Sequence, residues 1–148
     1  MILLDTNVIS EPMRPKPDQK VLAWLDAQAA ESLYVATVSL AELLLGIESL
    51  PAGKRRKALA AALHEQVIAL FGERIVPFDL GAAETYAQIV TRARRHGHPI
   101  AVADAQIAAI AASRQFTVAT RDQEPFKAAG VPVINPWTAT AEGPVGSV

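Results

Sequence analysis

Short apolar runs alternate along this chain with longer stretches in which apolar residues recur every three or four positions. The short runs are rich in Leu, Ile and Val and predict strands at residues 2–4, 33–38, 75–78, 117–120 and 131–134. The longer stretches have helical spacing and predict helices at about 18–29, 39–50, 54–71, 79–97 and 102–113. Shorter helices are expected after the first strand, with Asn7 as a cap, and within residues 121–129.

The alternation of strands and helices predicts the fold class. Strands joined by helices form right-handed βαβ crossovers, which give a mostly parallel sheet with helices on both faces. We therefore expect an α/β protein with a three-layer α/β/α fold around about five short strands. Pro77 places the strand at 75–78 at an edge of the sheet. Residues 1–137 are expected to form one domain, and residues 138–148 a flexible C-terminal tail.

Composition narrows the functional classes. The chain is 51% hydrophobic and 20% charged, as in a folded globular protein rather than a disordered one. Its net charge of −1 argues against broad electrostatic attraction to nucleic acid or to a membrane. The absence of cysteine excludes disulfides and thiolate metal sites and suits a cytoplasmic location. Because the chain starts with a strand-like segment and has no long apolar span, we expect neither secretion nor membrane insertion.

Four carboxylates are dispersed along the chain but are predicted to lie together in the fold. Asp5 and Asp122 each follow a predicted strand, whereas Glu42 and Asp104 lie early in predicted helices. All four therefore fall near the carboxyl edge of the sheet, where open α/β sheets bind ligands. Four like charges in one place repel each other unless a cation lies among them, and a site with only oxygen ligands favours Mg²⁺ or Mn²⁺ over zinc.

Each of these acids also has a structural interpretation. Asp5 is a preferred helix cap, and Glu42 completes a capping box with Ser39, in which the glutamate bonds back to the cap amide. Asp104 lies in a first turn, where the helix dipole favours an acid, and Asp122 is placed to cap the short helix that follows it. Taken one at a time, the acids leave both interpretations open, and only their joint pattern favours a site.

A family resemblance is carried by five segments that span nearly the whole chain, namely Met1-Ile-Leu-Leu-Asp-Thr-Asn-Val-Ile-Ser-Glu, Val38-Ser-Leu-Ala-Glu-Leu, Ala101-Val-Ala-Asp-Ala-Gln-Ile-Ala-Ala, Val118-Ala-Thr-Arg-Asp and Asn135-Pro-Trp. In this order they resemble the PIN-domain ribonuclease toxins of the VapC type and are especially similar to the FitB-like subgroup. The resemblance implies a PIN-like fold and places the acidic quartet of the family on Asp5, Glu42, Asp104 and Asp122.

The resemblance also distributes roles around the quartet. Asp5 and Asp104 are the expected direct metal ligands. Thr6, Asn7 and Thr120 match polar positions of the family next to the metal.

Asp122 departs from the commonest family pattern. Many members have asparagine at this position and an acid three residues further on, where this chain has Pro125. The FitB-like subgroup has aspartate at the position of Asp122, so we expect Asp122 to belong to the quartet.

The resemblance implies a Mg²⁺-dependent endoribonuclease, with Mn²⁺ able to substitute, that acts as the toxin of a toxin–antitoxin pair. A water activated by the metal would attack the RNA phosphate in line and leave 5′-phosphate and 3′-hydroxyl products. The family pattern also implies a homodimer that is inhibited by a VapB-like or FitA-like antitoxin. Operator DNA would be bound only through the antitoxin complex, consistent with the near-neutral charge of this chain.

Two other classes of function are open at the level of sequence. An aspartyl-phosphate phosphatase or a receiver-like domain also places an aspartate after a strand. The phosphatase pattern needs a second acid where this chain has Asn7, and the acidic pair and late lysine of a receiver are not visible. The other class is a non-catalytic regulatory subunit that binds an antitoxin for operon repression, against which the four intact acids argue.

Some further residues are candidates for contacts with RNA or with a partner. Phosphate binding is a hypothesis for the basic clusters at 54–57 and at Arg92, Arg94 and Arg95, although the second is better interpreted as complementing the dipole at a helix C-terminus. Trp24 and Trp137 are interpreted as packing residues. Leu45 is apolar on the Glu42 side of its helix, which is compatible with core packing alone and also suits a buried interface.

Overall fold

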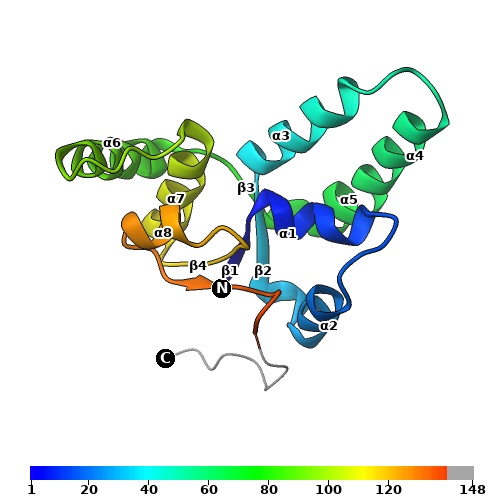
Figure 1. The fold of residues 1–148 in the computed structure, drawn as a ribbon, viewed down its shortest axis with the longest axis horizontal. Helices are drawn as coiled ribbons and strands as arrows, with labels where there is room; N and C mark the ends of the chain where they lie inside the picture. The colour runs from blue at the N-terminus through cyan, green and yellow to red at the C-terminus, as the bar shows by residue number, and fades with distance from the viewer. Residues whose placement is uncertain (140–148) are drawn as a thin grey trace.

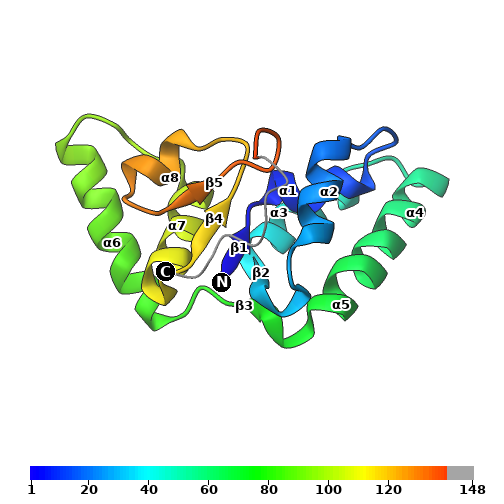
Figure 2. The same cartoon turned by 90° about the horizontal axis from the view of Figure 1, so that it is seen from below.

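The computed structural model describes residues 1–139, and these contain a five-stranded parallel sheet. The strands are β1 (Ile2–Leu4), β2 (Leu33–Ala36), β3 (Ile75–Val76), β4 (Thr117–Ala119) and β5 (Val133–Ile134). Their order in space is β3-β2-β1-β4-β5, so β1 lies at the centre and β3 at an edge, as Pro77 predicts (Figures 1 and 2). The five predicted strand positions are confirmed, although every strand except the first is shorter than expected.

The register of the central strands aligns the residues that follow them. Leu4 of β1 pairs with Ala119 of β4, so these two strands end at the same level. The ladder continues for one residue, because the Asp5 amide donates to the Ala119 carbonyl (2.9 Å) and the Thr120 amide donates to the Ile134 carbonyl (2.9 Å). Backbone hydrogen bonds therefore hold Asp5 and Thr120 at the carboxyl edge of the sheet.

Helices cover both faces of the sheet and complete the three layers (Figure 2). One face is covered by α6 (Leu80–Arg95), α7 (Val102–Arg114) and α8 (Glu124–Ala128). The other is covered by α1 (Thr6–Ser10), α2 (Gln19–Ala27), α4 (Lys54–Leu63) and α5 (Ala69–Phe71). Side chains alternate along a strand, so Leu3 packs in one core with Ile107 of α7, while Leu4 packs in a second core with Val8 and Leu63. The predicted α/β/α class is confirmed.

The helix α3 (Thr37–Glu48) lies between the two helical groups and contacts both α1 and α7. It follows β2 directly and begins two residues before the helix predicted from residue 39. With α4 it forms a helical hairpin that extends away from the sheet (Figure 1). Its outer side carries Leu44 and Leu45, which are 40% and 69% exposed. One end of α3 therefore reaches the sheet edge, and the helix leaves an apolar surface open.

The helix predicted over residues 54–71 is present but changes its winding. Between α4 and α5 it forms a π-helical turn at His64–Ile68, and Gly72, with a φ of 49°, ends it. Val67 is buried as predicted, but Leu70 is 66% exposed. The prediction that Leu70 is buried is wrong because the wider π turn rotates the residues after it around the helix axis.

Several smaller predictions are confirmed. Asp18 and Asp79 cap α2 and α6 by accepting hydrogen bonds from the amides two and three residues further on, at 2.8 and 2.9 Å. Trp24 is buried in the core beneath α2, and Trp137 packs against the same cluster. Short 3₁₀ turns lie at Glu11–Met13, Ala30–Ser32 and Gly72–Arg74.

Across residues 1–139, no helix is both long and apolar enough to cross a membrane. The tail predicted at 138–148 lies outside the described residues from residue 140 onward.

Candidate active site

Asp5 lies between β1 and α1. Its backbone is extended and its Oδ1 accepts a hydrogen bond from the Thr6 amide (2.8 Å), so Asp5 is the N-cap of α1. Its other oxygen, Oδ2, accepts a hydrogen bond from the Thr120 hydroxyl (2.8 Å). The prediction that Asn7 caps this helix is wrong, because α1 starts at Thr6 and Asn7 lies inside it. Asp5 is only 5% exposed, so the cap and the candidate metal ligand are one buried carboxylate.

The hydroxyl of Thr120 links the ends of β1 and β4. It is fully buried, donates to Asp5 and accepts hydrogen bonds from the Asp122 amide (3.0 Å) and the Asn7 side-chain amide (3.4 Å). A hydroxyl offers one donor and two acceptor positions, so this arrangement uses all three. Asn7 adds a further bond, since its Oδ1 accepts a hydrogen bond from the Arg121 amide (3.3 Å). The segment after β4 is thereby held against the start of α1.

Glu42 reaches the same place from α3. It is exposed, and its Oε1 accepts a hydrogen bond from the Thr6 hydroxyl (2.9 Å). The interpretation of Glu42 as half of a capping box with Ser39 is wrong, because α3 begins at Thr37 and no side chain among residues 1–139 caps it. Ser39 is instead buried, and its Oγ has no hydrogen-bond partner in the described part of the chain. Thr6 therefore ties Glu42 to the helix start where Asp5 lies.

Asp104 and Asp122 come from the α7 side of the sheet edge. Asp104 lies in the first turn of α7, so the position that the helix dipole favours is indeed occupied. The interpretation of Asp122 as a helix cap is wrong, because Gln123 is the N-cap residue of α8. The Asp122 side chain lines a cavity of about 770 Å³ that extends along residues 97–101 and α8.

The four acids form one electrostatic cluster. Burial raises the pKa of Asp5 above its ordinary value of 3.8, the hydrogen bonds that it accepts oppose this rise, and the charges of Asp104 and Glu42 add to it. Burial also raises the pKa of Asp104, and the charges of Asp122 and Glu42 raise it further. Each acid is therefore close enough to another member of the quartet to affect its ionisation or to be affected by it.

The donor set fits a hard divalent cation. A cation among these carboxylates would relieve their mutual repulsion, which adds to the effect of burial in raising the pKa of Asp5 and of Asp104. Within residues 1–139, no three acidic or histidine side chains converge into a ready-made metal-binding group. Mg²⁺ does not need one, because it commonly binds through one or two carboxylates and keeps several waters or takes substrate phosphate. The two carboxylates of Asp5 and Asp104 would therefore be enough protein ligands for Mg²⁺.

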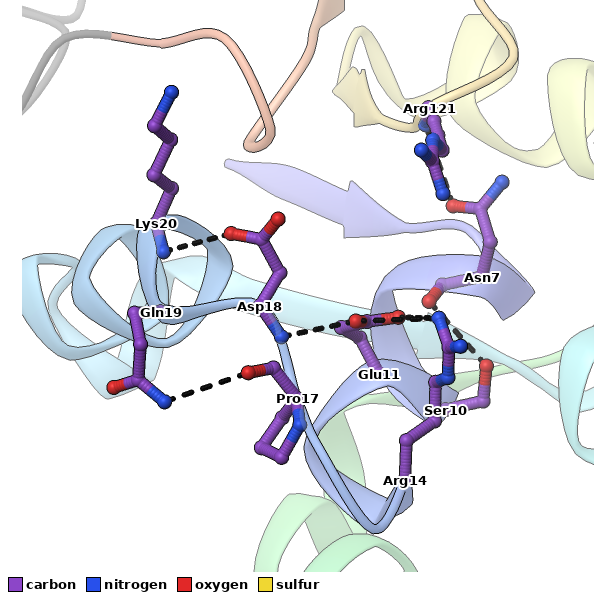
Figure 3. A network of polar contacts seen from close by, with 9 residues as sticks. All are labelled: Asn7, Ser10, Glu11, Arg14, Pro17, Asp18, Gln19, Lys20 and Arg121. Carbon is purple, nitrogen blue, oxygen red and sulfur yellow. Dashed lines mark hydrogen bonds and ion pairs between the residues drawn. The ribbon is translucent and has the colours of Figure 1, made fainter.

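Glu11 is a buried acid for which the sequence suggested no role. It lies in the 3₁₀ turn after α1, where its carboxylate accepts hydrogen bonds from the Arg14 side chain (3.2 Å) and the Asp18 amide (3.0 Å) (Figure 3). These bonds fix the connection between α1 and α2. Its partners lie three and seven residues further along the chain and are visible only in the folded chain.

One arginine of each basic cluster makes a structural contact. Arg56 forms an ion pair with Glu48, which joins α4 to α3. Arg92 donates to the Ala129 carbonyl (2.9 Å) and ties α6 to the end of α8. The other two arginines of that cluster lie in the last turn of α6, where the helix dipole favours a cation. Phosphate binding by either cluster stays a prediction.

The parallel sheet and the acids at its carboxyl edge agree with the family comparison. The PIN domain family model matches residues 2–131, and the chain therefore belongs to the PIN-domain family. Toxin FitB from Neisseria gonorrhoeae is 50% identical over 137 residues, which cover 93% of this chain and 99% of that protein. The VapC ribonuclease Y4jK from Sinorhizobium fredii is 48% identical over 137 residues, covering 93% of this chain and 98% of that protein.

A solved structure of FitAB bound to an IR36 DNA fragment has the same fold. It matches with a TM-score of 0.90 and 48% identity, and covers 95% of this chain and 98% of that one. The resemblance to VapC-type toxins of the FitB-like subgroup, inferred from five sequence segments, is confirmed.

Proposed function

We propose that this protein is a metal-dependent endoribonuclease and the toxin of a VapBC-like toxin–antitoxin system. The observation that carries the proposal is the set of acids at the carboxyl edge of the sheet. Thr120 bonds the Asp5 carboxylate and the Asp122 amide, Thr6 bonds Glu42, and Asp104 lies in the first turn of α7. The close similarity to a VapC ribonuclease and to the toxin FitB supports the same activity. Phosphodiester hydrolysis suits such a cluster, because a cation held by carboxylates stabilises charge that develops on a phosphoryl oxygen.

Asp5 and Asp104 are the residues that would hold the metal, for which we propose Mg²⁺ with Mn²⁺ able to substitute. Such a metal, when bound, polarises the phosphate and lowers the pKa of a water ligand. Each oxygen of Asp5 accepts one hydrogen bond and has a further lone pair. These bonds orient the carboxylate and leave a lone pair on each oxygen available to a metal.

The exposed carboxylates of Glu42 and Asp122 would orient the attacking water and accept its proton. An ionised carboxylate within reach of the attacking water orients it and accepts its proton. Thr6 holds Glu42 in place through its hydroxyl. In-line attack on phosphorus forms the new P–O bond and breaks the bond to the 3′ oxygen, which leaves 5′-phosphate and 3′-hydroxyl ends.

The proposed partner is an antitoxin of the VapB or FitA type, whose C-terminal segment lies in the active-site groove and inhibits cleavage. The structure of FitAB bound to DNA supports this pairing. Operator DNA is bound only through the antitoxin complex, in keeping with a net charge of −1 on this chain. We also propose a cytoplasmic homodimer, for which the exposed Leu44 and Leu45 offer an apolar surface.

The competing enzyme classes fit less well. Receiver domains have the strand order 2-1-3-4-5, whereas this sheet has the order β3-β2-β1-β4-β5. A phosphatase of the aspartyl-phosphate type needs an acid at the position of Asn7, whose side chain instead bonds Thr120 and the Arg121 amide. A non-catalytic regulatory subunit is distinguished by the cleavage assay that follows.

Cleavage of a mixed-sequence single-stranded RNA, with Mg²⁺ and with EDTA, tests the proposed function. The wild type is expected to cleave only with metal. Asp5→Asn and Asp104→Asn should each lower the rate by at least about 10³-fold, because several kcal/mol of charge stabilisation are lost. Asp26→Asn, which neutralises an exposed acid on α2, is the matched control. Cleavage in EDTA, or full activity in both site variants, would contradict the proposal.

A further inference from the structure

Arg121 lies between two residues of the candidate site. Thr120 before it bonds the Asp5 carboxylate, and Asp122 after it belongs to the acidic quartet. The Arg121 amide itself donates to Asn7 Oδ1 (3.3 Å), which holds this stretch of backbone at the sheet edge beside α1 (Figure 3). The backbone of Arg121 is therefore fixed within the site, while its side chain is exposed.

The side chain of Arg121 rests on an aromatic support. Its guanidinium lies over the Trp137 ring, 5.2 Å from the ring centroid. Trp137 is itself held in place, since its amide donates to Asn135 Oδ1 (2.9 Å) and its side chain packs against a core cluster. A cation–π contact uses the flat face of the guanidinium and leaves the N–H donors, which lie in its plane, available to a ligand.

Five other arginines of the described chain make contacts away from the candidate site. Ion pairs with carboxylates occupy Arg14, Arg56 and Arg114, and hydrogen bonds to backbone carbonyls occupy Arg74 and Arg92. Within residues 1–139, no carboxylate forms an ion pair with Arg121, although acids of the quartet are its sequence neighbours. Arg121 is thus an arginine at the site whose donors are not committed to the fold.

The negative charge of the acidic quartet makes a nearby cationic side chain such as Arg121 useful for binding RNA. Single-stranded RNA carries a negative charge at each phosphate, and the quartet repels it. A metal held by Asp5 and Asp104 would balance the negative charge of the phosphate that is cleaved, but not the charge of the neighbouring phosphates. We propose that Arg121 is a positioning residue that binds the backbone phosphate next to the scissile one, through the planar donors that suit a phosphate. This inference rests on the proposed ribonuclease function and adds how the strand is placed.

Steady-state cleavage of an RNA oligonucleotide that the wild type cuts, measured over a range of KCl concentrations, tests the inference. Arg121→Gln should raise KM about tenfold and change kcat less than about twofold, because the lost contact is made by the bound substrate as well as by the transition state. The slope of log(kcat/KM) against log[KCl] should become shallower by about 0.7, the value for one phosphate contact on a single strand. Arg121→Lys should keep the wild-type slope, because it keeps the charge.

The matched control is Arg114→Gln, which removes the same charge from an exposed pair with Asp79. Arg114 ends α7, about 15 Å along the helix from Asp104 at a rise of about 1.5 Å per residue, so KM and the salt slope should not change.

A chemically altered substrate tests the contact without any variant. One uncharged methylphosphonate next to the cleaved bond should raise the KM of the wild type about tenfold and have little further effect on Arg121→Gln. Equal effects on both proteins would overturn the inference, as would a wild-type KM and salt slope in Arg121→Gln. If Arg121→Gln binds the antitoxin more weakly but keeps the wild-type KM and salt slope for RNA, Arg121 contacts the protein partner instead, which would also overturn the inference. Failure of the wild type to cleave RNA would overturn the proposed function as well.

Discussion

The two acids expected to hold the metal, Asp5 and Asp104, lie in different surroundings. Asp5 directly follows the central strand, is almost fully buried and accepts hydrogen bonds from Thr6 and Thr120. Asp104 lies in the first turn of α7 and is partly exposed. The pKa of Asp5 is raised by burial but held back by its hydrogen bonds, whereas burial and like charges raise that of Asp104 and no hydrogen bond among residues 1–139 opposes them.

This difference separates two ways in which a fold prepares a charged site. The strand end supplies a ligand that neutral donors already orient, so its geometry belongs to the folded protein. The helix supplies a ligand whose charge is left for a cation to balance. Removing the hydrogen bonds that hold Asp5 should therefore lower the stability of the fold. Removing the charge of Asp104 should raise that stability, because it removes repulsion.

Among variants that test this difference without removing an acid of the site, the largest effect is expected from loss of the Thr120 hydroxyl. Thr120→Val keeps the shape of the side chain but leaves Asp5 Oδ2 and the amide of Asp122 without their partner. A buried polar group left unpaired costs about 1–3 kcal/mol, which urea unfolding measures. Cleavage should fall about 10–100-fold, as is typical when a group that orients a metal ligand is lost.

Thr120→Ser is the control for this variant. It keeps the hydroxyl and removes one methyl group, which costs about 1 kcal/mol in a packed site. Its cleavage rate should stay close to that of the wild type. Equal loss of activity in the valine and serine variants would show that packing, and not the hydrogen bond to Asp5, matters at this position.

A smaller effect is expected from the charge of Asp104. Because its pKa and that of Asp5 are raised above 3.8, the folded state binds these protons more tightly than the unfolded state does. The stability that the two groups contribute is therefore fully present below about pH 3.8 and is lost as the pH rises through the raised pKa values. Without metal, the free energy of unfolding of Asp104→Asn should exceed that of the wild type by an amount that grows as the pH rises through the raised pKa of Asp104.

The gain should be on the order of 1 kcal/mol or less, because solvent screens a partly exposed group. Unfolding of both proteins at several pH values, in EDTA, measures it. If Asp104→Asn is instead less stable than the wild type at neutral pH, attraction to the helix dipole outweighs repulsion within the quartet.

Much of the site could be predicted from the sequence because a short apolar run is enough to predict each strand. The apolar run of β1 ends at a carboxylate, and parallel strands share one carboxyl edge, so the acids after β1 and β4 had to lie near each other. The choice of cap was harder. Asp5 and Asn7 are both good caps, and only the position of the first helical residue decides between them.

What could not be predicted depends on contacts between distant residues. The capping-box pattern of Ser39 and Glu42 is present in the sequence, but α3 starts early because β2 ends at Ala36, so the motif lies inside the helix. The exposure of Leu70 follows from a π turn that no local pattern announced. The pairing of Arg121 with Trp137 joins the end of β4 to the segment after β5 and appears only once both strands are in place.

The central claim is that Asp5 and Asp104 share one divalent cation. Calorimetric titration of the protein with Mg²⁺, in the absence of RNA, tests it most directly. The wild type and the Asp26→Asn control should bind one ion per chain, and the affinity should fall at least about tenfold in Asp5→Asn and in Asp104→Asn alike, because each removes a carboxylate ligand. Mg²⁺ affinity in Asp104→Asn equal to that of the wild type would contradict the claim.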